Sequence, residues 1–184
     1  MNKVAKRILI WVVVLGTLAA LTFYFAVPMC IHPMWAANQR SASDALKSLY
    51  SAQADFSSND RDENKIQDYW RSDVAGLYVM KSQGQPLKLI ELSCALADDR
   101  PVVPAGPREP KAGYWFRAIR FAGESKPGPK RFAFCAFPEA YPKTGKQTFI
   151  INEDNTVYRK DLGAARGVEV WPADPLKEGW EKLD

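Results

Sequence analysis

Residues 35–56 read WAANQRSASDALKSLYSAQADF, and this stretch decides the fold. It is rich in alanine and contains neither glycine nor proline, the two residues that most disfavour a helix interior. Apolar side chains recur in it at helical spacing, while most charged side chains fall elsewhere. The apolar stripe consists of Ala42, Leu46, Leu49 and Phe56. The pattern predicts an amphipathic helix over residues 30–56, with one face that must pack against another layer.

An uncharged apolar run, residues 8–27, precedes this helix. About 20 apolar residues suffice to cross a bilayer core of roughly 30 Å, so we expect a transmembrane helix over residues 8–29. Three cations lie before the run, and the next charged residue after it is Arg40. By the positive-inside rule, this asymmetry places residues 1–7 in the cytoplasm and the rest of the chain outside.

The N-terminal segment allows two other interpretations. A cleaved signal peptide also begins with basic residues, but its apolar core spans only about 7–15 residues and ends at small side chains. Here bulky aromatic residues occupy positions 23–25. The other interpretation is lipidation of Cys30, although the residues before it lack the small side chain that a lipobox requires. We expect a retained anchor.

Two prolines follow the apolar run. Proline has no amide hydrogen and restricts the residue before it. Pro28 and Pro33 therefore predict that the helix breaks or kinks near residues 30–33 and resumes beyond them.

Composition limits what the rest of the chain can be. The 184 residues are 47% hydrophobic and 25% charged, which suits one globular domain. Three of the 25 Lys and Arg residues precede the apolar run, so the remainder nearly balances the 21 Asp and Glu residues. A near-neutral domain gives no reason to expect a nucleic-acid partner.

After residue 56 the pattern changes to short β-type segments separated by Gly and Pro, which predicts an extracytoplasmic α+β domain over residues 57–184. A polar turn at residues 153–155 predicts a hairpin, and a Gly/Pro-rich loop at residues 122–129 predicts a second one. The expected strands are residues 77–80, 114–121, 131–137, 148–152 and 156–160; a short helix is expected within 87–97, an extended loop over 101–110 and an irregular tail over 171–180. The fold class is α+β: a long N-terminal helix packed on a small antiparallel sheet.

Residues able to carry catalysis are scarce. The one histidine, His32, lies beside the predicted membrane boundary, which argues against a hydrolytic triad. No Cys-x-x-Cys pair supports zinc. Cys94 and Cys135 fall on the side of the membrane where disulfides persist, so we expect them to bond. The alternative is that both are small buried core residues. We expect no enzymatic activity.

An acidic loop gives the one candidate metal site. Its oxygen-bearing residues occupy positions 1, 3, 5 and 9 of the loop, a spacing typical of short calcium loops. They are Asp60, Asp62, Asn64 and Asp68. Lys65 stands where such loops need glycine, and Arg71 stands where they need a bidentate glutamate. A solvated, self-capping acidic loop is the alternative to calcium, and we expect no other cofactor.

Several segments resemble known families. A basic start, one apolar helix, an amphipathic continuation and a small antiparallel sheet make up the layout of type IV pilins and of type II secretion pseudopilins. The segments that resemble their post-anchor region are residues 38–49, 52–56, 59–64 and 73–78. Downstream, the chain resembles a family of extracytoplasmic proteins of unknown function. The matching residues are 113–117, 132–134, 138–141, 144–145, 148–152 and 157–163.

The resemblance implies a pilin-like, non-enzymatic assembly protein of the bacterial inner membrane with a periplasmic head. Its partners would be the lipid bilayer and other membrane-anchored pilin-like subunits or secretion-system proteins. The Gly and Glu of the pilin processing site are missing, because residues 8–12 read ILIWV. We therefore expect an uncleaved anchor. The alternative function is a membrane-anchored extracytoplasmic binding module for peptide, glycan or calcium.

Overall fold

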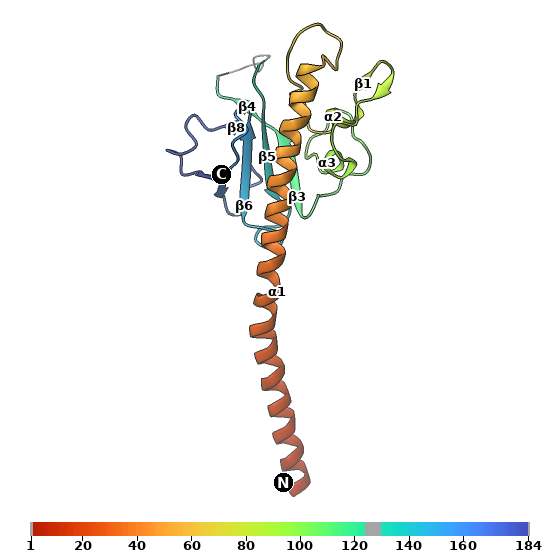
Figure 1. The fold of residues 1–184 in the computed structure, drawn as a ribbon. Helices are drawn as coiled ribbons and strands as arrows, with labels where there is room; N and C mark the ends of the chain where they lie inside the picture. Colours follow the sequence, from red (N-terminus) through yellow and green to blue (C-terminus); the bar gives the residue numbers. More distant parts are fainter. Residues whose placement is uncertain (1, 124–129, 184) are drawn as a thin grey trace.

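One long helix organises the molecule. The computed structural model describes residues 2–123 and 130–183, and its helix α1 (Lys3–Ser58) extends from the N-terminus into the head (Figure 1). At roughly 1.5 Å per residue, its 56 residues span about 84 Å. Of the break or kink expected near residues 30–33, a break does not occur, since helical backbone continues across both prolines. Each proline removes one helix hydrogen bond, and the turns on either side remain helical.

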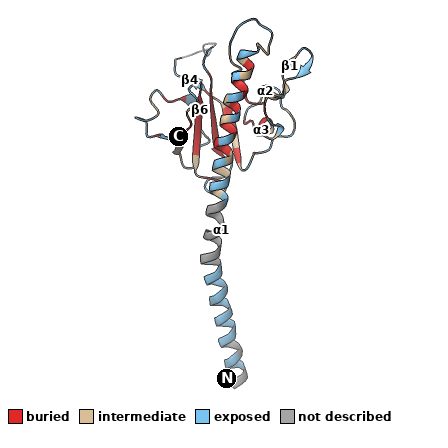
Figure 2. Ribbon diagram, viewed as in Figure 1, coloured by how far each residue is buried: buried red, intermediate tan, exposed pale blue. Residues whose placement is uncertain are grey.

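The two halves of α1 differ in burial (Figure 2). The segment Ala5–Thr22 has a mean hydropathy of 1.7, and none of its described side chains is buried, so it is long and apolar enough for a membrane anchor or a signal sequence. Trp35 is the first described α1 side chain that bonds to the head, where its Nε1 donates to the carbonyl of Lys143 at 2.9 Å. The predicted stripe is confirmed, because Ala42, Leu46, Leu49 and Phe56 are all at most 1% exposed.

A five-stranded antiparallel sheet receives this stripe. Helix α1 packs across its two neighbouring strands β5 and β6. The strand order is β3-β5-β6-β7-β9, with β3 (Tyr114–Ala118), β5 (Ala133–Pro138), β6 (Gln147–Asn152), β7 (Tyr158–Asp161) and β9 (Glu181–Lys182). The hairpin expected around residues 153–155 is confirmed, since β6 pairs with β7 in the register Ile150 to Tyr158. The second expected hairpin pairs β3 with β5, and residues 124–129 of its connection lie outside the described residues.

Short elements complete the head. They are α2 (Gly76–Val79), β1 (Lys81–Ser82), β2 (Gln85–Pro86), α3 (Leu92–Leu96), β4 (Arg120–Phe121) and β8 (Val170–Trp171). The strand expected at residues 77–80 was wrong, because α2 occupies that place. Its first turn is fixed by the Asp73 carboxylate, which accepts from Gly76 N at 2.9 Å. The helix expected within residues 87–97 is α3, and residues 101–110 contain no helix or strand, as expected.

The sheet is buried on both faces. Side chains alternate along β5, so Phe134 and Ala136 join the core beneath α1, whereas Cys135 and Phe137 join a second core on the opposite face. The C-terminal tail covers this second face, where Trp171 and Trp180 are 8% and 5% exposed. The tail is therefore held by its two buried tryptophans.

The two cysteines expected to form a disulfide lie on opposite faces of this sheet. Cys94 belongs to the core beneath α1 and Cys135 to the second core, and both are free, buried thiols. A disulfide requires Cα atoms about 4.4–6.8 Å apart with their side chains directed toward each other. The structure therefore corresponds to the alternative interpretation, in which each cysteine fills space in a core. Burial raises the pKa of each thiol to about 12.

Candidate functional site

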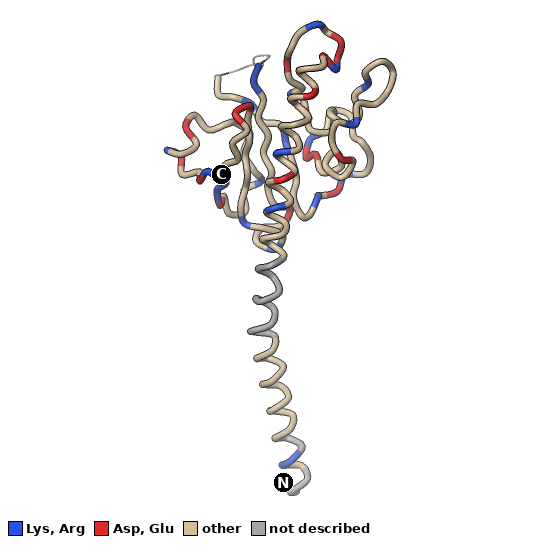
Figure 3. Tube along the Cα trace, viewed as in Figure 1, with Lys and Arg blue, Asp and Glu red and all other residues tan. Residues whose placement is uncertain are grey.

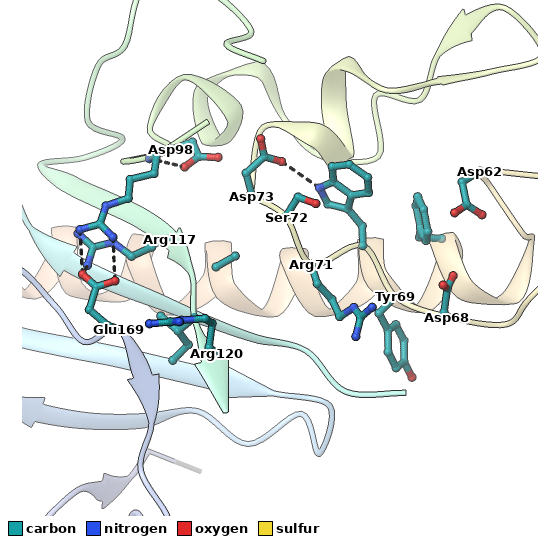
Figure 4. A pocket seen from close by; sticks show the side chains of 15 residues that line it. Asp62, Asp68, Tyr69, Arg71, Ser72, Asp73, Asp98, Arg117, Arg120 and Glu169 are labelled. Carbon is teal, nitrogen blue, oxygen red and sulfur yellow. Dashed lines mark hydrogen bonds and ion pairs between the residues drawn. The ribbon is translucent and has the colours of Figure 1, made fainter. Parts of the chain in front are cut away.

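A cleft of about 600 Å³ lies between the loop after α1 and the edge of the head formed by β3 and β4 (Figure 4). Its lining is unusually rich in charge for a surface that also contains Phe56, Tyr69 and Trp70. The charged lining residues are Arg71, Arg100, Arg117 and Arg120 with Asp62, Asp68, Asp73, Asp98 and Glu169. Basic and acidic residues are interspersed over the whole head (Figure 3). In this cleft, in contrast, several of each lie close together.

One wall of the cleft is fixed from α1 by Gln53. Its side chain is fully buried and pairs with the backbone of Trp70: Trp70 N donates to Gln53 Oε1 at 2.9 Å, and Gln53 Nε2 donates to the Trp70 carbonyl. Trp70 Nε1 in turn donates to Asp73 Oδ1 at 2.9 Å. The indole covers Gly76, where an added Cβ would lie 2.3 Å from the ring. Gln53 therefore fixes a wall made of Trp70, Asp73 and Gly76, which lie 17 or more residues further along the chain.

Asp98, behind the cleft, has a structural role. One of its oxygens accepts from Val74 N and Ala75 N at 2.7 and 2.8 Å, and the other accepts from Arg100 N at 2.8 Å. Burial raises the pKa of the Asp98 carboxyl, although the three backbone donors act in the opposite direction. With its oxygens engaged by backbone groups, Asp98 holds the chain around α2 in place.

Arg117 is the central charged residue. It points from β3 and is only 4% exposed, with its guanidinium 4.9 Å from the centre of the Phe137 ring. Its Nε donates to Asp99 Oδ2 at 3.1 Å, its Nη2 donates to the same oxygen, and its Nη1 donates to Glu169. Figure 4 shows the Arg117 and Glu169 pair at one end of the cleft. A charge this deeply buried requires a paired carboxylate, and Arg117 bonds to two of them.

Three further arginines surround the same carboxylates. Arg100 forms a bidentate pair with Glu169 at 2.8 and 2.9 Å. Arg166 Nη2 donates to Asp99 Oδ1 at 3.3 Å, while Arg108 Nη2 approaches that oxygen only to 3.8 Å. We define the arginine cluster as Arg100, Arg108, Arg117 and Arg166 together with Asp99 and Glu169. These six residues line a second cavity of about 330 Å³.

The predicted calcium residues lie at the other end of the large cleft. Asp62 and Asp68 line it, and Asn64 Nδ2 bridges them, donating to Asp62 Oδ2 at 2.7 Å and to Asp68 Oδ2 at 3.4 Å. Asp60 instead accepts from Lys65 N at 3.0 Å. Among the described residues, no group of three or more His, Cys, Asp or Glu side chains is arranged to hold a metal ion.

Internal bonds organise the acidic loop. Asn64 Oδ1 accepts from Ile66 N at 2.6 Å, so its amide is used on both sides. Desolvation is the main cause that raises the pKa of Asp62, and the neighbouring charge of Asp68 adds to it. The side chain of His32 lies outside the described residues.

The match to a family begins where α1 first contacts the head. Residues 35–181 match the family described as "Protein of unknown function (DUF2950)". The chain belongs to the DUF2950 family. Its DUF2950 domain contains the packed half of α1 and nearly all of the head, and it stops short of the exposed segment Ala5–Thr22. No pilin family is matched. No curated protein and no solved structure matches the chain.

The arginine cluster in the DUF2950 domain was not predicted from the sequence. Its members come from four separate stretches, and each one alone has the appearance of a surface charge. One signal was present, because Arg117 interrupts the apolar strand YWFRA, where a charge on a buried face needs a partner. The acidic loop, in contrast, is visible in the sequence, because its residues are neighbours in the chain and their spacing can be read there.

Proposed function

We propose that this DUF2950 protein is a single-pass, pilin-like assembly subunit of the bacterial inner membrane, with its head in the periplasm. The observation that supports this proposal is the division of α1 into an exposed apolar half and a half packed on an antiparallel sheet. The helix connects the two parts directly, so the position of the head follows from that of the anchor.

The exposed half of α1 has the dimensions of a membrane segment. The 18 residues Ala5–Thr22 extend about 27 Å at roughly 1.5 Å per residue, close to the thickness of a bilayer core. Large apolar side chains protrude on all sides of it, among them Ile10, Trp11, Val13 and Leu15, which are 57–65% exposed. Such a surface is stable in lipid or against other helices, and it would associate in water.

Packing against other subunits follows from the same helix. Gly16 has no atom within 4 Å of the position a Cβ would take, so another helix can approach its backbone there. Helix association in lipid depends on such close packing, because apolar side chains gain little from leaving lipid. The proposed role is therefore lateral association of anchors, with each head carried outside the membrane.

Cysteine cross-linking in native membranes tests this proposal. Cys30 is changed to serine, and positions 11–18 are changed to cysteine one at a time. The native Cys94 and Cys135 do not interfere because both are buried. After mild oxidation, we expect the yield of disulfide-linked dimer to rise and fall with a period of about 3.6 residues, as a packed helix face requires.

A control distinguishes specific packing from collision. Cysteine at Ser58, an exposed residue at the end of α1 in the head, should give no comparable dimer. Low or uniform yields over positions 11–18 would contradict assembly and favour an isolated anchor. The intact mass of the extracted protein separately tests the anchor, because a mature start near residue 30 would show that the segment is removed.

A further inference from the structure

The arginine cluster contains more positive charge than its own carboxylates compensate. Four guanidinium groups face two carboxylates, Asp99 and Glu169, which leaves a local excess of two positive charges. All four arginines have an atom within 3.8 Å of an Asp99 oxygen. An isolated structural ion pair needs one arginine for each carboxylate, so the additional cations require another explanation.

Most of the hydrogen-bond donors in the cluster do not bond to its two carboxylates. Each guanidinium carries five N–H groups. Of the twenty in these four described residues, six donate to Asp99 or Glu169. Arg108 makes none of these bonds, and its guanidinium is held 5.3 Å from the centre of the Trp115 ring. All four guanidinium groups line the 330 Å³ cavity, so an anion that enters it lies within reach of donors that the two carboxylates do not use.

The base of the cluster is rigid. Arg117 is buried on β3, and Asp99 is aligned beside that strand because Asp99 N donates to the Phe116 carbonyl at 2.8 Å. Glu169 is aligned from the other side, where its carbonyl accepts from Arg120 N at 3.0 Å. A rigid base lowers the cost of ordering that binding would otherwise incur.

The rim of the cluster is accessible. The side chains of Arg100, Arg108 and Arg166 are 61%, 45% and 71% exposed. They can therefore move to meet a ligand while Arg117 stays fixed below them. The adjoining cleft of about 600 Å³ shares Arg100, Arg117 and Glu169 with this cavity, so it has room for the rest of a larger molecule.

We propose that the arginine cluster binds a phosphoryl dianion, either free phosphate or the phosphate group of a monoester. The planar fork of arginine matches the oxygens of phosphate in pairs, and a charge near −2 neutralises the local excess. A single carboxylate would neutralise only half of that excess. This site is independent of the proposed assembly of α1, because it uses residues of the head alone.

Calorimetric titration of the full chain in phosphatidylcholine nanodiscs tests the site. Inorganic phosphate is added at pH 8, where it is mainly dianionic, and sodium chloride of equal ionic strength serves as the reference. We expect saturable binding to one site. The variant Arg108→Ala/Arg166→Ala should weaken it by roughly tenfold or more, since hydrogen bonds to charged groups are lost. These two arginines are exposed, so the fold should survive.

A variant with the same change of net charge provides the control. Arg159→Ala/Lys182→Ala alters two cations on strands β7 and β9, away from the cluster, and should keep the affinity within about twofold. Equal weakening in both variants, or no saturable binding below roughly 10 mM phosphate, would overturn the proposal, leaving a structural ion-pair network.

Two further titrations identify the source of the phosphate. Binding of glycerol phosphate supports a soluble monoester. A response to vesicles of phosphatidic acid, without one to glycerol phosphate, supports a lipid headgroup. In either case the Arg108→Ala/Arg166→Ala variant must lose the response, and a response that it retains would contradict the site.

Discussion

Gln53 links the long helix to the wall of the cleft, so its replacement tests the packing of the head. Gln53→Leu keeps an apolar side chain, one atom shorter, in the same buried place and removes both hydrogen bonds to the Trp70 backbone. Each such bond stabilises by about 0.5–1.5 kcal/mol, and a buried group left unpaired costs about 1–3 kcal/mol. Because one N–H and one carbonyl are left unpaired, we expect a loss of about 2–6 kcal/mol in the free energy of unfolding.

Urea unfolding of the full chain in detergent micelles, followed by tryptophan fluorescence, measures this loss. Ser51→Leu is the matched control, because Ser51 lies two residues away on the exposed side of α1 and should change stability by no more than about 0.5 kcal/mol. If Gln53→Leu is equally harmless, the paired amide does not hold the cleft wall, and our account of this wall fails.

Three other outcomes are expected. Gly76→Ala should destabilise by about 1–3 kcal/mol in thermal melts because its Cβ would overlap an indole ring, whereas Gly16→Ala, with nothing within 4 Å, should not. The pKa of about 12 for Cys94 and Cys135 lies above the ordinary thiol value of 9.0, so their stabilising contribution is complete below pH 9 and is lost as pH rises toward 12. Urea midpoints should fall over that range, and less steeply when both are alanine. Millimolar calcium should leave the Tm unchanged, because amide groups already occupy oxygens of the acidic loop; a rise that Asp62→Ala abolishes would restore the calcium interpretation.

Local patterns in the sequence determined the elements that depend on near neighbours. The stripe through Leu46 and Leu49 has the helical period, so it specified both the packed half of α1 and the face that meets the sheet. The polar turn at residues 153–155 specified the β6–β7 hairpin, because it joins two strands that are neighbours in the chain. The apolar run before residue 28 was equally visible, since it depends on composition alone.

Local patterns misled where distant contacts decide the structure. Residues 77–80 have the apolar composition of a strand, yet the Asp73 carboxylate and the Asp98 carboxylate, 24 residues beyond Val74, fix the backbone there as α2. Gln53 is similarly a polar residue typical of an exposed helix face. It is buried because the backbone of Trp70, 17 residues away, pairs with its side chain.

Only the tertiary structure assembled the charged site. Asp99 lies 18 residues from Arg117 and Glu169 lies 52 residues from it, and the pairing of β3 and β4 with their neighbours brings all three together. The spacing of these three residues in the sequence does not predict that they lie close together, because backbone hydrogen bonds of a different segment position each one. The sequence by itself determined an apolar segment followed by an amphipathic helix on a small sheet. The tertiary structure decided where buried charges converge, since ion pairs in a protein interior require three-dimensional proximity.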